Sequence, residues 1–389
     1  MAVLPKDFIG KQVVMKILFL ADPNSIHDVK WISYFTSRNK VEAFLLPRRQ
    51  HWPNPDLRIP GIEVETLDPI EDFSMVRFPR TITTAIYIRK MVVRHKIDLI
   101  NIHYAEPNAL WCLFRWYLRV PMIITTLGTD VLITIPKSFE RKTLINYLVA
   151  PAYKRAFRNA DWITSTSKTQ VDSVKEFSGR KGEFDIIRTG VDTERLLSDT
   201  SAFFPLQDNS AYVLFPRYIK PIYNHEFSLK AISLLPEAIK ANYTMVFLGR
   251  NEGDMNYQKE LEHLMRGQKD VKFVFLGKQS QEAIFELYKR AGAVVMCPIS
   301  DGSPVSGMET LLCGTKLILG PPNYDTDVFS QAIRMRTWDA NELATLITQA
   351  LDDPGRPQLS AETIAAMDRE TNMQKMMHIY ESLMEGKEM

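Results

Sequence analysis

Two acidic residues flank a loop rich in glycine, serine and proline in the second half of the chain. Asp301 and Glu309 lie eight positions apart, and Gly302, Ser303 and Pro304 follow the first acid. The segment is typical of a strand, a loop and then a helix, whose first amide groups favour an anion such as a diphosphate. A carboxylate one turn into that helix could reach ribose hydroxyls, and one before it could meet a sugar.

The same segment has a purely structural interpretation. Ser306 followed three residues later by Glu309 is the pattern of a capping box. In that interpretation the serine caps the helix and the glutamate reaches back to the serine backbone. The two interpretations do not exclude each other.

Short apolar runs that alternate with amphipathic stretches predict βαβ units and parallel sheets. In the first half we expect a helix over 29–38 and strands over 15–21, 41–46, 121–126 and 160–165, with a further strand that ends at His103. A segment rich in Ser, Asp and Pro, 197–209, predicts a linker. Beyond it we expect strands over 212–216, 243–248, 271–276, 293–298 and 316–319, and a last helix over 370–384. Two doubly wound domains that face each other would bind a ligand in the cleft between them.

Length and composition agree with two ordinary globular domains. The chain has 389 residues, of which 45% are hydrophobic and 24% charged. Its three cysteines have no metal-ligand spacing and predict inert thiols in a reducing compartment. We find neither a secretory signal nor an apolar run near the ~20 residues of a membrane span. We therefore expect a cytoplasmic protein.

The charge distribution points to a partner for the first half only. A net charge of +2 argues against nucleic-acid binding, but residues 1–200 hold 29 Lys and Arg against 22 Asp and Glu. Basic residues mix with apolar and aromatic ones over 77–96 and 110–119, which suggests peripheral contact with the inner face of a membrane. The alternative is that both segments are core-facing helices with solvated basic faces.

The run from Asp301 to Glu309 resembles the acid–seven residues–acid signature of retaining glycosyltransferases with the GT-B fold, especially glycosyltransferase family 4. Other stretches are similar to the family at the expected distances, namely 25–31, 160–167, 189–192, 271–278 and 284–291. The resemblance covers residues 15 to 385. It implies an α/β chain with two Rossmann-like doubly wound domains across a cleft. We expect an acceptor-side domain over 1–200, a nucleotide-sugar-binding domain over 205–369, and a terminal helix over 370–389 that packs back on the first domain.

The resemblance also implies roles for individual residues. Glu309 would bind the donor ribose, and the amides of Val305 and Ser306 would bind the diphosphate. The transferred sugar would face Asp301, Gly302, Ser303 and Pro304. Arg217 and Lys220, after the first strand of the second domain, would neutralise charge on the leaving phosphate. Gly128 and Asp130 belong to a loop at the cleft, and His103 joins Asp301 as a catalytic candidate.

The implied activity is retaining transfer of a hexose-type sugar from a nucleotide-diphosphate donor to a glycan, lipid-linked or small-molecule acceptor. Surface polysaccharide or glycoconjugate synthesis is the expected context, with neither metal nor other cofactor. Two positions depart from the family pattern: residues 22–25 replace paired glycines, and Leu127 stands where many members have a histidine. These departures motivate an alternative, a non-catalytic sugar-nucleotide-binding relative or partner subunit.

Overall fold

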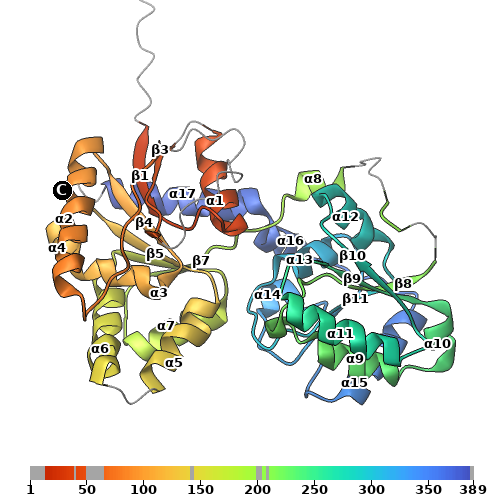
Figure 1. Ribbon diagram of the computed structural model, residues 1–389. Helices are drawn as coiled ribbons and strands as arrows, with labels where there is room; N and C mark the ends of the chain where they lie inside the picture. Colours follow the sequence, from red (N-terminus) through yellow and green to blue (C-terminus); the bar gives the residue numbers. More distant parts are fainter. Residues whose placement is uncertain are drawn as a thin grey trace, which may run out of the picture.

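The computed structural model describes residues 14–38, 41–49, 65–140, 144–198, 204–206 and 210–385. They form two α/β domains, each with a parallel sheet between layers of helices (Figure 1). Most of the predicted linker over 197–209 lies outside the described residues.

The N-terminal sheet has seven described strands in the order β3-β2-β1-β4-β5-β6-β7. Its strands are β1 (Met15–Leu20), β2 (Val41–Leu45), β3 (Glu65–Thr66), β4 (Leu99–His103), β5 (Met122–Thr126), β6 (Trp162–Ser165) and β7 (Phe184–Ile186). Every residue of β4 and β5 is buried, as expected of strands covered on both faces. The predicted strands are confirmed, whereas the short edge strands β3 and β7 were not predicted.

Helices cover both faces of this sheet. They are α1 (Ile26–Thr36), α2 (Phe78–His95), α3 (Ala105–Asn108), η2 (Ala109–Phe114), α4 (Arg115–Leu118), η3 (Asp130–Thr134), α5 (Ile135–Glu140), α6 (Leu144–Asn159) and α7 (Lys168–Ser178). The next helix, α8 (Thr193–Leu197), packs on the C-terminal domain through Leu196. Helix α1 begins three residues before the predicted start because the Ser25 side chain caps it by accepting from the Asp28 amide.

The C-terminal sheet has six described strands in the order β10-β9-β8-β11-β12-β13. Its strands are β8 (Tyr212–Phe215), β9 (Thr244–Leu248), β10 (Lys272–Leu276), β11 (Ala293–Met296), β12 (Leu317–Leu319) and β13 (Ile333–Arg334). Strand order reverses between β8 and β11 here, and between β1 and β4 in the first sheet. Ligands of such sheets bind beyond the carboxyl ends of the strands at these points.

The helices of the second half alternate with these strands. They are η4 (Pro221–Tyr223), α9 (His225–Ser233), α10 (Glu237–Asn242), α11 (Met255–Gly267), α12 (Gln281–Arg290), α13 (Val305–Leu312), α14 (Thr326–Phe329), α15 (Ala340–Asp352), α16 (Ala361–Met367) and α17 (Arg369–Glu385).

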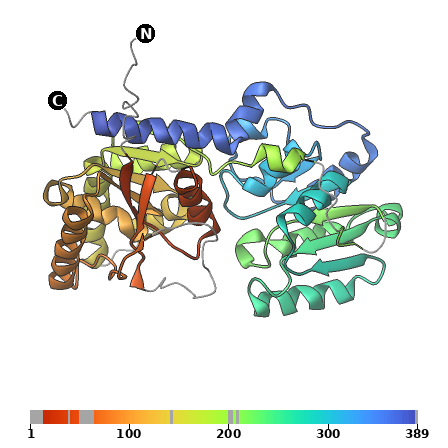
Figure 2. The same ribbon diagram turned by 90° about the horizontal axis from the view of Figure 1, so that it is seen from above.

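Helix α17 returns to the N-terminal domain and lies along it (Figure 2). Its Met373, Met376 and Ile379 belong to one buried cluster with residues of β1 and α1. The Tyr380 hydroxyl donates to Asn101 Oδ1 on β4 at 2.6 Å. The chain thus crosses between the domains twice.

The two crossings lie side by side. Val191 and Asp368 form a parallel bridge, and the Val191 amide donates to Met367. Gly190 adopts φ +66°, and a Cβ there would lie 2.6 Å from Arg369 Cα. Only glycine suits this position, because a side chain would meet both backbone strain and a backbone clash.

We predict that Gly190→Ala destabilises the protein by about 2–4 kcal/mol, since it adds left-handed strain to overpacking. Urea denaturation followed by far-ultraviolet circular dichroism measures the change. Gly267→Ala is the matched control, because a Cβ at the end of α11 meets nothing within 4 Å. Equal stability of the two variants would contradict the prediction.

Candidate functional site

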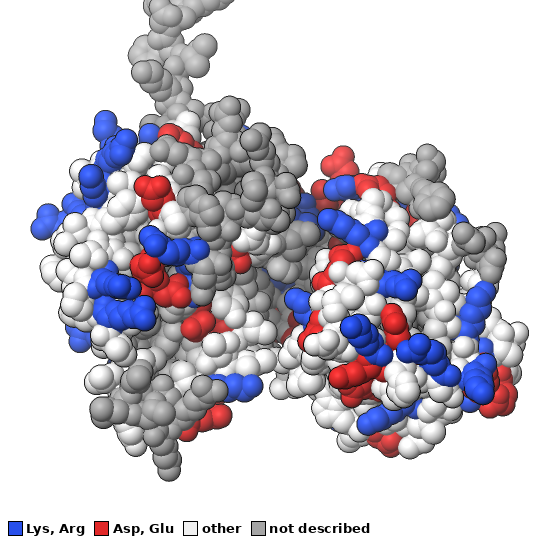
Figure 3. Space-filling view, viewed as in Figure 1, with Lys and Arg blue, Asp and Glu red and all other residues white. Residues whose placement is uncertain are grey.

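A cavity of about 600 Å³ opens between the domains, at the strand ends of both sheets. This volume is in the range of small-molecule sites. Figure 3 shows the two lobes with a hollow between them. The N-terminal wall consists mainly of hydroxyl, amide and basic residues, namely Ser25, His27, Lys30, Tyr104, Leu127, Gly128, Thr129, Leu132, Thr166, Gln170, Arg188 and Thr189.

The loop after β11 forms the opposite wall. It runs from Ser300 to Pro304, and helix α13 begins at Val305 with no side-chain cap. The first amides of a helix have no intrahelical partner, and the helix dipole is positive there. Val305 and Ser306 line the cavity, so the start of this helix borders it.

The capping-box interpretation is wrong. Ser306 is the second residue of the helix and not its cap. Its hydroxyl accepts from Arg217 Nη1 at 3.1 Å. The Glu309 carboxylate instead accepts from Gln281 Nε2 at 3.1 Å and faces the cavity.

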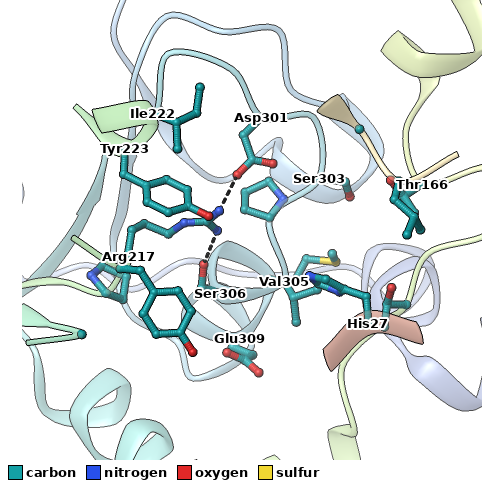
Figure 4. A pocket seen from close by; sticks show the side chains of 18 of the residues that line it. His27, Thr166, Arg217, Ile222, Tyr223, Asp301, Ser303, Val305, Ser306 and Glu309 are labelled. Atoms are coloured by element: carbon teal, nitrogen blue, oxygen red, sulfur yellow. Dashed lines mark hydrogen bonds and ion pairs between the residues drawn. The ribbon is translucent and has the colours of Figure 1, made fainter. Parts of the chain in front are cut away.

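An ion pair ties the two central loops of the C-terminal sheet together (Figure 4). Arg217 Nη2 lies 3.1 Å from Asp301 Oδ2, and the guanidinium lies 4.3 Å from the Tyr223 ring centre. Burial raises the pKa of Asp301, although Arg217 opposes this. Burial works against the charge of Arg217, but Asp301 and Tyr223 raise its pKa overall. Arg217 is therefore a fixed cation beside the start of α13.

Glu309 is a buried carboxyl group whose protonation is poised near neutrality. Burial raises its pKa to about 7, while Lys30 and Arg369 favour the charged form. Burial lowers the pKa of Lys30, and Glu309 opposes that shift. Lys30 is on α1 and Arg369 starts α17, so basic residues from outside the second sheet tune this carboxyl group.

The sequence analysis gave no role to His27 and Lys30, although the stretch 25–31 was one of the family-like segments. Both residues lie in the first turns of α1 and line the cavity. Desolvation by the surrounding atoms lowers the pKa of His27, with Asp28 and Asp301 opposing, although the residue keeps an exposed surface. Figure 4 places His27 on the N-terminal side of the cavity. The sequence did contain a signal for both residues, because they follow the loop over 22–25 in the family-like stretch 25–31.

The structure corrects two predicted roles. His103 is 1% exposed, lies 3.0 Å from Asp28 Oδ1 through Nδ1, and packs edge-on against Phe19 and Trp31. It does not line the cavity, so its contacts support α1 and not a reacting group. Lys220 is exposed and also does not line the cavity, because the chain turns into η4 immediately after it.

The remaining predicted site residues lie either in the lining of the cavity or directly behind it. Gly302, Ser303 and Pro304 line the cavity, and a Cβ on Gly302 would lie 2.6 Å from Ser167 Oγ of the N-terminal domain. Gly128 lines the cavity, but Asp130 lies behind it. Its carboxylate accepts from the amides of Ala105 at 2.7 Å and Gly128 at 2.9 Å. Asp130 thus shapes the loop.

Within the described ranges, no group of three or more His, Cys, Asp or Glu could hold a metal ion. No helix there is long and apolar enough to cross a membrane.

Two family models match the chain. The model described as glycosyl transferase 4-like matches residues 16–167, and that of glycosyl transferases group 1 matches residues 199–367. A search of curated proteins gave no match.

Several solved structures share the two-domain architecture over nearly their whole length. HepE of Anabaena, solved with UDP, is 14% identical with a TM-score of 0.71, over 95% of this chain and 99% of its own. The α,α-trehalose 6-phosphate synthase of Burkholderia multivorans is 11% identical with a TM-score of 0.73, over 96% and 99%. The sucrose-phosphate synthase of Thermosynechococcus elongatus is 16% identical with a TM-score of 0.67, over 96% and 100%. These likenesses confirm the predicted GT-B fold.

We predict that the Glu309 carboxyl group titrates near pH 7 and that Lys30→Met raises its pKa further, because the variant loses a favourable positive charge. Carbon-13 NMR of labelled glutamate, assigned with Glu309→Gln, measures both values. Lys90→Met, on the exposed face of α2, is the matched control. A pKa near 4.5, or one insensitive to Lys30, would show that the cleft does not bury this group as described.

Proposed function

The chain belongs to the glycosyl transferases group 1 family, and from this premise we propose that it transfers a hexose from a nucleotide-diphosphate donor with retention of configuration. The acceptor would be a glycan, a lipid-linked or a small molecule. One observation carries the proposal: Arg217 and the start of α13 stand at one point of the cavity, with the Glu309 carboxylate one helical turn away.

This spacing fits the diphosphate and the ribose of a nucleoside diphosphate. Glu309 lies four positions after Val305 in the helix, a rise of about 6 Å. We place the diphosphate on the amides of Val305 and Ser306 and on Arg217, and the ribose hydroxyls on Glu309. The structure of HepE with UDP, and that of the same protein with UDP-glucose, support a nucleotide sugar as ligand.

The sugar would lie beside Asp301 and Gly302, where the cavity meets the N-terminal wall. Bond cleavage leaves negative charge on the departing diphosphate, which preorganised donors stabilise. Arg217 and the helix start would supply this stabilisation without a metal. For retention, the acceptor hydroxyl attacks on the face that the phosphate leaves, and a phosphate oxygen takes its proton. We assign no protein general base, and His103 has no part in the step.

A second candidate is binding without transfer. Leu127 lines the cavity at the position where many family members have a histidine. The leucine offers no hydrogen bond to a sugar. Donor binding without turnover across an acceptor panel would favour this candidate.

We predict that one class among UDP-, GDP- and ADP-sugars raises the melting temperature, because a ligand that binds only the folded state stabilises it by about 2.7 kcal/mol at a hundredfold its Kd. Glu309→Gln should weaken that ligand tenfold or more, since hydrogen bonds to a charged group contribute about 1.5–3 kcal/mol.

Glu260→Gln, on the exposed side of α11, is the matched control and should bind like the original protein. An unchanged melting temperature with every nucleotide sugar at millimolar concentration would contradict the proposed donor site. When a donor is found, the anomeric proton of the product, observed by NMR, decides between retention and inversion.

We also propose that the outer face of α2 contacts an anionic membrane surface. Exposed Ile86 and Val93 lie on this helix with exposed Lys90 and Arg94. Figure 3 shows Lys and Arg along the outer margin of this lobe, where Figure 1 places α2. The segment 110–119 contributes less than predicted, because η2 buries Leu110, Trp111 and Cys112; Trp116 stays 74% exposed.

We predict co-sedimentation with anionic liposomes at low salt, and an affinity loss of about thirtyfold or more for Lys90→Glu combined with Arg94→Glu, since each basic residue near such a surface contributes about 1 kcal/mol. Liposomes of neutral lipid are the control. Equal sedimentation with both lipid compositions, or none with either, would contradict the proposal.

A further inference from the structure

Arg188 of the N-terminal half reaches across to the C-terminal domain. It follows β7, and its side chain is 4% exposed. Nη2 lies 2.6 Å from Asp325 Oδ2 and 3.0 Å from Asp327 Oδ2. Both acids lie at the start of α14, so this buried guanidinium spans the domain boundary.

Asp325 has a second partner in the N-terminal domain. Its two carboxylate oxygens accept from the backbone amide of Lys168 at 3.0 and 3.1 Å. Lys168 is the first residue of α7, where the helix dipole is positive and amides lack intrahelical partners. The buried Asp325 carboxylate thus accepts hydrogen bonds from a guanidinium and from the first amide of a helix, both on the other side of the domain boundary.

The same guanidinium also reaches the loop assigned to the sugar. Arg188 Nε donates to Ser303 Oγ at 3.2 Å. The adjacent Gly302 lies so close to Ser167 that a Cβ would come within 2.6 Å of its hydroxyl oxygen. Residues 302 and 303 are therefore held by the N-terminal domain and not only by their own sheet.

We propose that Arg188 is a positioning residue that couples closure of the domains to the geometry of the 301–304 loop. When the domains meet, one side chain pairs with Asp325 and fixes Ser303. If the domains part, both contacts are lost together. The kinetic part of this inference rests on the proposed glycosyl transfer, whereas the closure part does not.

The test compares Arg188→Gln with Arg115→Gln. Arg115 pairs with Asp161 inside the N-terminal domain, so its variant loses an arginine–aspartate pair without touching the boundary. We expect small-angle X-ray scattering to give a larger radius of gyration for ligand-free Arg188→Gln only. We expect kcat to fall at least tenfold and nucleoside diphosphate affinity to fall less than kcat, because Arg217 and the start of α13 stay in place while Glu309 loses only the nearby charge of Lys30.

Removing one partner of a buried pair leaves the other charge uncompensated, so Arg188→Gln could lower stability. Arg188→Gln combined with Asp325→Asn removes both charges and should recover stability but not closure. An unchanged radius and kcat in either folded variant would overturn the proposal. If the original protein transfers no sugar, the proposed function fails, and the scattering comparison still decides whether Arg188 holds the domains closed.

Discussion

The Arg217–Asp301 ion pair is the interaction on which the cavity depends. It joins the loop after β8 to the loop after β11, the two strands at which the order of the C-terminal sheet reverses. The same guanidinium donates to Ser306 and so fixes the start of α13. This pair therefore fixes the position of the Arg217 guanidinium relative to the first amides of α13.

The charge balance of the site requires elements from both domains. Glu309 is buried, and its burial alone favours the neutral acid. The opposing cations are Lys30 on α1 and Arg369 at the start of α17. Separation of the domains would remove Lys30 and leave Glu309 a weaker acceptor for a hydroxyl group. The ionisation of the site is thus linked to how the domains meet.

The features that could be predicted from the sequence are those that a local pattern of residues determines. Buried parallel strands appear as apolar runs, and the residues from Asp301 to Glu309 follow such a run, so their place in the cleft could be foreseen. His103 also ends a strand, but its ring packs on Phe19 and Trp31. These contacts between residues distant in sequence could not be predicted from the local pattern. The turn after Lys220 redirects its side chain, and the start of α13 is fixed by Arg217 and not by a cap. Lys30 and Arg188 were missed because their partners are distant in sequence.

The arrangement of the two crossings explains why the contacts of Arg188 depend on how the two domains are oriented. The Arg188 amide donates to Asn372 Oδ1 on α17 at 2.9 Å, and Gly190, two residues on, packs against Arg369. The backbone of Arg188 is thereby fixed to the helix that belongs to the N-terminal core, while its side chain bonds Asp325 and Ser303. Hydrogen bonds fail within about an ångström of displacement. A small rotation at the paired crossings is therefore enough to release Ser303 and its loop from the N-terminal domain.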